Sequence, residues 1–308
     1  MSDDALRPAR RFLHVCYCCA DAAAVTAFFV DQLSMRNTMS TTPGRSSGAI
    51  LGMDRDISSA AAFVYDARGP RTSPAIEVQG WVDPPLVGRP VSDPTAAGIQ
   101  ALGFSVPALA TACERLVGAG CTRVADGTQA FGSPWATLRD PRGVTLDVVE
   151  DAAVPRGETR MRHLRMTVTA VAGSVPWYEA LGFAVVDREH LSDASFLGVE
   201  GRVEADVVRL RLPDEPFEAV LIEWHHPPSH GHHVSEANHA GLYRTAVGVD
   251  DTRRSHAAMT AAGVSFDRAP TSIELRGTPV PDMWICFLSD PDGVPFELVE
   301  RPRSAFRP

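Results

Sequence analysis

The 308-residue chain lacks the features that mark secreted, membrane-spanning and nucleic-acid-binding proteins. Its six cysteines are too few for a disulfide framework in a chain of this size, so reduced thiols are expected. No apolar run approaches the roughly 20 residues that span a bilayer, and Met1–Asp4 lacks the basic and apolar regions of a secretory signal. The net charge of −9 and the absence of a basic cluster argue against nucleic acid or an anionic membrane as a partner. We therefore expect a cytoplasmic protein with a small-molecule partner.

What the chain does contain is an ordinary globular composition and two repeated motifs. Hydrophobic residues make up 44% and charged residues 22%, which is typical of a folded protein, and the length allows two domains. Residues Asp140–Asp147 read Asp-Pro-Arg-Gly-Val-Thr-Leu-Asp, and Asp290–Glu297 read Asp-Pro-Asp-Gly-Val-Pro-Phe-Glu. Each is a tight turn leading into a strand with a carboxylate four residues after its glycine. Because two strand histidines, His14 and His163, have nearly the same offset as these turns, the pattern indicates a duplicated unit.

The hydrophobic periodicity predicts four copies of one module, a strand and a helix followed by three strands. The expected helices cover approximately residues 22–33, 109–119, 175–181 and 252–262. One curled sheet with one helix leaves an open concave face, so two modules must pair to enclose a cleft.

We expect the modules to pair within each half of the chain. The Pro- and Gly-containing stretch 151–158 is the predicted linker between the halves. The predicted N-terminal domain is 1–150, with modules at about 11–90 and 98–150. The predicted C-terminal domain is 159–308, with modules at about 160–228 and 239–302.

This layout resembles the vicinal oxygen chelate superfamily, which includes glyoxalase I, bleomycin-resistance proteins and type I extradiol dioxygenases. The resemblance covers about residues 11–301. It rests on the early strand histidine, the aromatic pair Trp177-Tyr178 followed by Leu181-Gly182-Phe183, and the Asp-Pro-Asp-Gly turn before Glu297. It implies an α+β fold of four βαβββ modules paired into two curled-sheet half-barrels. Many relatives complete their clefts through subunit contacts, so a homodimer is one expectation, although four modules suffice for a monomer.

The resemblance also implies a divalent metal ion (Fe, Mn, Zn or Ni), bound by the first and last strands of paired modules. Carried over residue by residue, it gives the C-terminal cleft the ligands His163, Glu223 and Glu297, with Arg244 at the fourth position. Alternatively, Arg244 replaces the metal and pairs with one of the glutamates in a buried salt bridge. The substrate contacts predicted for this cleft are Arg165, Thr167, Trp224 and Arg244.

The N-terminal cleft would offer His14, Glu77 and Asp147, with Ala101 at the fourth position. Strand parity places Glu77 and Glu223 toward their clefts, because residues two apart share a face. However, aligning the Trp-x-x-Pro-Pro segments that follow these strands sets Glu77 opposite Val220. One of the two acids is then misassigned unless a bulge intervenes.

The function implied by the resemblance is a metal-dependent enzyme that chelates two oxygens of a small, oxygen-rich metabolite. The two arginines predicted for the C-terminal cleft, Arg165 and Arg244, favour an anion over a polymer. Lyase or isomerase chemistry is favoured, with Glu223 or Glu297 as a general base if it is not a ligand. An extradiol-type dioxygenase is an alternative suggested by the four-module length, although Arg244 stands where dioxygenases have their second histidine. The other alternative is a small-molecule binding or resistance protein without catalysis.

Overall fold

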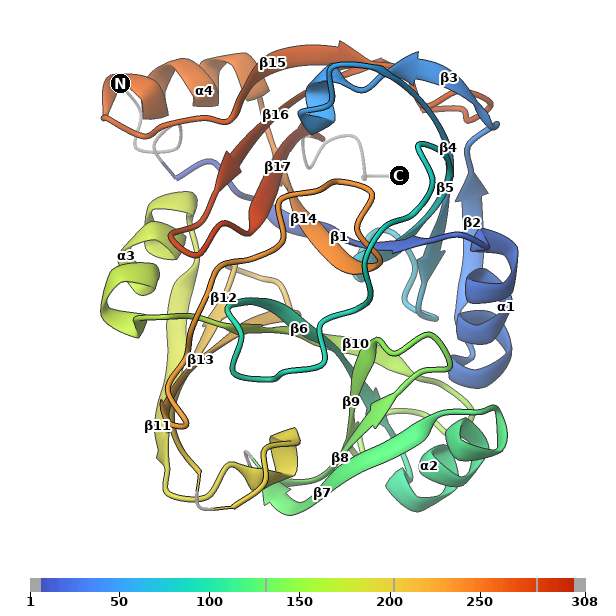
Figure 1. Cartoon of the computed structure of the whole chain (residues 1–308), viewed down its shortest axis with the longest axis vertical. Coiled ribbons are helices and arrows are strands. Elements are labelled where there is room, and N and C mark those ends of the chain that lie inside the picture. The colour runs from blue at the N-terminus through green and yellow to red at the C-terminus, as the bar shows by residue number, and fades with distance from the viewer. Residues whose placement is uncertain (1–6, 131, 202, 281, 302–308) are drawn as a thin grey trace.

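The computed structural model describes residues 7–130, 132–201, 203–280 and 282–301, and in them the chain forms four successive modules (Figure 1). The first contains β1 (Arg11–Cys19), α1 (Ala22–Leu33), β2 (Arg36–Ser40), β3 (Gly44–Ser47), the 3₁₀ helix η2 (Ala49–Leu51), β4 (Asp56–Tyr65) and β5 (Ala75–Asp83). The second contains β6 (Gly98–Val106), α2 (Leu109–Gly118), β7 (Thr122–Ala130), β8 (Ser133–Arg139) and β9 (Thr145–Glu150). The third contains β10 (Arg160–Thr167), α3 (Val171–Leu181), β11 (Ala184–Leu191), the 3₁₀ helix η3 (Ser195–Leu197), β12 (Glu204–Arg211) and β13 (Glu218–His226). The fourth contains β14 (Gly241–Val249), α4 (Thr252–Ala261), β15 (Arg268–Ile273), β16 (Met283–Ser289) and β17 (Pro295–Glu300).

The modules pair as first with fourth and second with third. The outer sheet has the strand order β15-β16-β17-β14-β1-β5-β4-β2, with β3 paired to β4, and the inner sheet has the order β11-β12-β13-β10-β6-β9-β8-β7. Antiparallel pairs join the modules, β1 with β14 in the outer sheet and β6 with β10 in the inner sheet. The four-module α+β fold with two curled sheets is therefore confirmed. The expectation that modules pair within each half is wrong, because the first strand of every module offers a similar edge and local periodicity does not select its partner.

The helices cover the convex faces of the sheets, where the main core lies. α1 begins after Asp21, whose side chain accepts a hydrogen bond from the backbone N–H of Ala24 at 2.9 Å. α1 buries Val25, Phe28, Phe29 and Leu33, the three- to four-residue spacing of an amphipathic helix. Among the helices of the described residues, none combines the length and apolar character that crossing a bilayer requires.

The helix α3 begins at Val171, four residues before the predicted start. The Glu223 carboxylate, on β13, accepts a hydrogen bond from the backbone N–H of Val171 at 2.7 Å. A carboxylate at this end of a helix satisfies a free N–H and interacts favourably with the helix dipole. Glu223 therefore holds a helix on the convex face of the inner sheet.

The repeated Asp-Pro turns are fastened by buried tyrosines. The Asp290 carboxylate accepts hydrogen bonds from the backbone N–H groups of Asp292 and Val294, at 3.0 and 2.8 Å, and from the hydroxyl of Tyr178 at 2.9 Å. The Asp140 carboxylate likewise accepts a hydrogen bond from the hydroxyl of Tyr17, at 2.7 Å. Burial raises the pKa of Asp290 from 3.8 to about 6, despite these hydrogen bonds.

Protonation of Asp290 is expected to make the stability of the protein depend on pH. Since its pKa is higher in the folded state, the stabilising effect is present below about pH 4 and is lost as the pH rises through about 6. We expect wild type to gain up to about 3 kcal/mol over Asp290→Asn between pH 7 and pH 4. Urea unfolding of both proteins across this range measures the gain, and a pH-independent difference between them would contradict the prediction.

Candidate functional site

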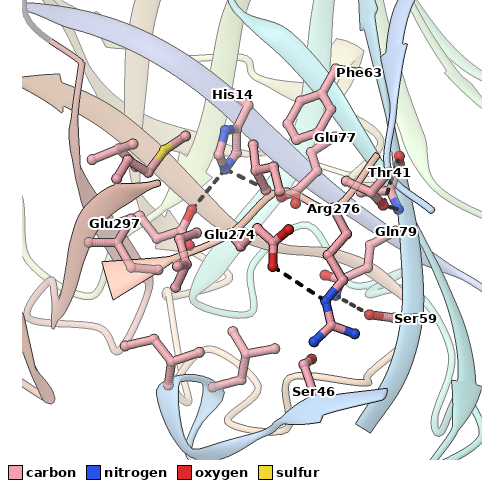
Figure 2. Close-up of a pocket in the computed structure, with 18 of the residues that line it drawn as sticks. His14, Thr41, Ser46, Ser59, Phe63, Glu77, Gln79, Glu274, Arg276 and Glu297 are labelled. Carbon is pink, nitrogen blue, oxygen red and sulfur yellow. Dashed lines mark hydrogen bonds and ion pairs between the residues drawn. The ribbon is translucent and has the colours of Figure 1, made fainter. Parts of the chain in front are cut away.

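The concave face of the outer sheet encloses a cavity of about 640 Å³, here called the outer cleft (Figure 2). Its floor is formed by the central strands β17, β14, β1 and β5. Its roof comes from residues 41–51 of the first module and 268–276 of the fourth. The two parts of the roof touch: the backbone N–H of Thr42 donates to the carbonyl of Arg276 at 2.8 Å, and Arg268 Nε donates to the carbonyl of Ala49 at 3.2 Å. The cavity therefore requires both the first and the last module.

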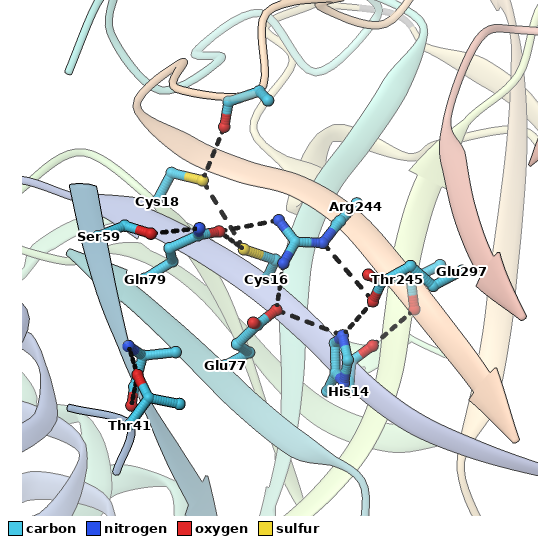
Figure 3. Close-up of polar contacts among 12 residues, drawn as sticks. His14, Cys16, Cys18, Thr41, Ser59, Glu77, Gln79, Arg244, Thr245 and Glu297 are labelled. Carbon is cyan, nitrogen blue, oxygen red and sulfur yellow. Dashed lines mark hydrogen bonds and ion pairs between the residues drawn. The ribbon is translucent and has the colours of Figure 1, made fainter. Parts of the chain in front are cut away.

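Four ionisable side chains meet on the floor of the outer cleft (Figure 3). His14 Nε2 lies 2.9 Å from Glu297 Oε2 and 3.3 Å from Glu77 Oε2. Arg244 Nη2 donates to Glu77 Oε2 at 2.8 Å, and its Nη1 donates to Gln79 Oε1 at 2.9 Å. Arg244 Nε lies 3.7 Å from Glu297 Oε2 and has no hydrogen-bond partner among the described residues.

Strand register explains this convergence. In the parallel pair β1–β5, His14 is opposite Ala75, so Glu77 lies two residues further along the same face of the sheet. In the parallel pair β14–β17, Glu297 is opposite Ala246, and Arg244 lies two residues before Ala246. The four side chains thus come from four neighbouring strands and point to one side.

The charges of the cluster favour a cation. Burial by itself raises the pKa of Glu297, but the charge of Arg244 and the hydrogen bond to His14 outweigh it, so the pKa lies below the usual value. The carboxylate is therefore ionised at neutral pH. Two carboxylates face one guanidinium in this buried site, and this excess of acidic groups attracts a positive ion.

The donor set on this floor suits a divalent metal. One imidazole nitrogen and two carboxylate oxygens form a set that Fe(II), Mn, Zn and Ni accept, and three protein ligands leave coordination positions open. His14, Glu77 and Glu297 are the residues that could hold the ion, and Arg244 takes the place where the resemblance implies a fourth ligand. Each carboxylate lies within 3.3 Å of His14 Nε2, so each could share an ion with His14, although the ligand atoms of the three residues do not all lie within 4.8 Å of one another.

The concave face of the inner sheet is closed, in contrast. Asp147 accepts hydrogen bonds from Arg165 Nε and Nη2 at 2.7 and 3.0 Å and lies 3.1 Å from His163 Nε2. The Trp135 ring stacks on His163 with centroids 5.1 Å apart. Phe196, in the connection between β11 and β12, packs edge-on against Trp135. The hollow beside Arg165 measures about 10 Å³, the space of about one water molecule, so this inner cleft has no room for a substrate.

Register shows which ligand positions the inner cleft has lost. His163 is opposite Glu218 on β13, so Val220 stands where the outer cleft has Glu77. Asp147 is opposite Gly103 on β6, and Ala101, two residues earlier, stands where the outer cleft has Arg244. This settles the conflict over the two acids: Glu77 faces a cleft and Glu223 does not.

The structure does not bring together the ligand set predicted for the C-terminal cleft. His163 belongs to the inner sheet and Glu297 belongs to the outer sheet. Glu223, on β13, turns its carboxylate to the start of α3. Glu297 instead contacts His14, which also contacts Glu77; His14 and Glu77 were the candidates of the other predicted cleft. The cause is the pairing of the first module with the fourth.

The predicted face of β13 is also wrong. Val220, Ile222 and Trp224 pack in the apolar cluster of the inner cleft, whereas Leu221 belongs to the helix-covered core. Both faces of this strand carry buried apolar residues because the inner cleft is filled, so alternation alone does not identify the helix side. Trp224 Nε1 donates to Thr167 Oγ1 at 3.1 Å inside this filled cleft. These two of the four predicted substrate contacts therefore lie away from the open cavity.

Sequence reasoning missed the roof of the outer cleft. Arg268 and Arg276 line the cavity from an exposed strand and the loop beyond it, which have no periodicity that points inward. Gln79 lies two residues after Glu77 on the same face of β5, but its hydrogen bond with Arg244 follows only from the pairing of distant modules.

The comparisons with known proteins agree with the architecture. The family model for the Glyoxalase/Bleomycin resistance protein/Dioxygenase superfamily matches residues 11–148 and 160–298, whereas no curated protein sequence matches. Glyoxalase I from Zea mays is similar in structure, with a TM-score of 0.66 at 18% identity over 96% of this chain and 93% of that one. A candidate dioxygenase from Bacillus subtilis has a TM-score of 0.60 at 14% identity over 96% and 87% of the two chains. With both halves matched by the model, the chain belongs to the Glyoxalase/Bleomycin resistance protein/Dioxygenase superfamily.

Proposed function

We propose that the outer cleft is the active site of a metal-dependent enzyme, of lyase or isomerase type, that acts on a small anion with two neighbouring oxygen atoms. The observation that carries this proposal is the contact of His14 Nε2 with a carboxylate oxygen of both Glu77 and Glu297 on the floor of a 640 Å³ cavity. These three residues are the proposed ligands. The ion would act as a Lewis acid that chelates the two substrate oxygens and lowers the energy of an enolate-like charge. A ligand set with one histidine favours this chemistry over the ring cleavage of extradiol dioxygenases, for which the resemblance implies two histidine ligands.

Arg244 is the proposed anchor for the substrate's negative charge. Its guanidinium is buried, and its bonds to Glu77 and Gln79 fix its position before a substrate arrives. A preorganised cation of this kind stabilises developing negative charge without having to reorganise during the reaction. Arg268 and Arg276 add positive charge to the roof, so an anion meets cations on two sides.

Glu297 is the better candidate for the general base, a role that its carboxylate can take only while it does not bind the ion. The two hydrogen bonds that Arg244 donates on the floor, at 2.8 and 2.9 Å, go to Glu77 and Gln79. Its Nε stays 3.7 Å from Glu297. The lowered pKa keeps Glu297 ionised, and its Oε2 faces the cavity beside His14, where it can accept a substrate proton. The chain contains no lysine, so imine chemistry on a lysine is not an alternative.

The walls of the outer cleft suit a small organic anion. Apolar side chains line it beside the polar floor and restrict water around the reacting atoms. These residues are Leu13, Phe63, Met283, Ile285 and Val299.

Metal analysis of protein purified without a histidine tag tests the proposal. After reconstitution with Mn, Fe, Ni or Zn, we expect one bound equivalent in the outer cleft that His14→Ala with Glu77→Gln removes. Unchanged metal content in this double variant would contradict the proposed ligands. Turnover of small hydroxy and oxo acids should then depend on the same equivalent.

A metal-free binding protein is the second candidate, and one observation favours it. Arg244 lies 2.8 Å from Glu77 and 3.7 Å from Glu297, so the carboxylates on the floor have a cationic partner without any metal ion. Such a cleft would hold an anion through its arginines. Saturable binding of a small dicarboxylate by chelator-treated protein, together with no metal uptake in the outer cleft of wild type, would support this candidate and overturn the enzyme.

A further inference from the structure

A second group of metal-ligating side chains lies outside both clefts, on the inner sheet. His190 at the end of β11, Asp206 on β12 and His225 on β13 come from three neighbouring strands. His190 Nδ1 is 2.7 Å from Asp206 Oδ1, and His225 Nε2 is 3.1 Å from Asp206 Oδ2. In the part of the chain that the structure describes, these three residues form a group whose ligand atoms all lie within 4.8 Å of one another.

The sheet itself preorganises this group. His190 is directly opposite Asp206, and Asp206 is opposite Glu223, which lies two residues before His225 on the same face. The two imidazole rings are 6.2 Å apart and nearly parallel, at 27°. Both present a nitrogen to the same carboxylate, so an ion needs little rearrangement to bind all three side chains. The hydrogen bonds from both histidines hold the pKa of Asp206 below its usual value, so the carboxylate is available as a ligand.

The chemistry of the group indicates which ions it would take. Two imidazoles and one carboxylate prefer Zn, Ni, Cu or Co over the hard ions Mg and Ca, which bind oxygen ligands. The side chains are partly exposed, so water can fill the remaining coordination positions.

We propose that His190, Asp206 and His225 form a divalent transition-metal site separate from the outer cleft. The site joins the end of β11 to the start of β12 and to β13. Because the connection between β11 and β12, which contains Phe196 and Leu197, fills the inner cleft, the site fixes both ends of that connection. Phe196 and Leu197 of that segment pack against Trp135 and Val220. A bound ion therefore holds the inner cleft closed.

Zn(II) titration of the Glu297→Gln protein tests the site without the contribution of the outer cleft. We expect one saturable equivalent whose affinity falls at least about tenfold in His190→Ala and in His225→Ala, as for the loss of a ligand or its immediate support. The matched control is His226→Ala, which removes an exposed histidine next to His225 and is expected to leave the affinity unchanged. An equal loss in this control, or unchanged affinity in both ligand variants, would overturn the proposal.

Two further measurements keep the result independent of how Glu297→Gln folds. In the wild-type background, His190→Ala with His225→Ala should lower Zn(II) content by one equivalent and leave the outer equivalent in place. Hydrogen exchange of residues 195–199 should slow when Zn(II) is added to wild type and not to this double variant. Exchange that Zn(II) does not change would overturn the role in closing the inner cleft.

Discussion

Replacing Glu297 with glutamine is expected to lower the metal affinity of the outer cleft by more than about 100-fold, because even residues that only support a ligand typically contribute 10- to 100-fold. The substitution removes the ionised oxygen that lies 2.9 Å from His14 Nε2 and keeps the size of the side chain. It also removes the proposed general base, so any turnover should fall by at least as much. Elemental analysis after dialysis against a weak chelator measures the affinity.

Glu274→Gln is the matched control for this experiment. Glu274 lines the same cavity, but it is exposed and belongs to the roof, where it lies 3.7 Å from Arg276. Glu274→Gln makes the same change from carboxylate to amide away from the floor, so it should leave the metal content near the wild-type value. If Glu297→Gln retained as much metal as Glu274→Gln, the ion would not be held by Glu297.

Replacing Asp147 with alanine is expected to destabilise the protein by about 3–5 kcal/mol, the usual cost of breaking a buried ion pair from one side. Asp147 is fully buried and accepts two hydrogen bonds from Arg165, so its loss leaves a guanidinium without a counter-charge in an apolar interior. Guanidinium chloride unfolding measures the cost. Metal content of the outer cleft should not change, because Asp147 belongs to the other sheet.

The surface pair Asp126–Arg123 provides the control for burial. It has the same two residue types at 2.5 Å but is about half exposed, so Asp126→Ala should cost less than about 1 kcal/mol. The double variant Asp147→Leu with Arg165→Met should regain most of the lost stability, since well-packed apolar residues can replace a buried pair. A cost for Asp147→Ala no larger than that for Asp126→Ala would show that the buried pair is not needed.

The modules and their ligand-bearing strands could be predicted from the sequence, because both depend on local periodicity. The two Asp-Pro turns and the offset between His14 and His163 indicate the duplication. α1 lies at the residues predicted for it, since its apolar spacing and the cap at Asp21 are both local signals.

The composition of each cleft could not be predicted in the same way. Pairing within halves and the observed pairing, first module with fourth and second with third, both use the first strand of each module. Nothing local distinguishes β14 from β6 as the partner of β1. Parity failed on β13 for a different reason. The segment around Phe196 buries apolar residues on the concave face of β13, and α3 covers apolar residues on its convex face. The hydrophobic pattern of β13 therefore does not show which face is covered by the helix.

The pairing of the first and last modules also orders the events of biosynthesis. His14 and Glu297 are 283 residues apart in the chain, so the outer floor cannot assemble until the chain has been synthesised through Glu297. The inner sheet uses only residues 98–226 and can form earlier, which brings the two outer modules together and shortens the loop that remains to be closed. The filled inner half thus serves as a scaffold, and incomplete chains would carry no competent site.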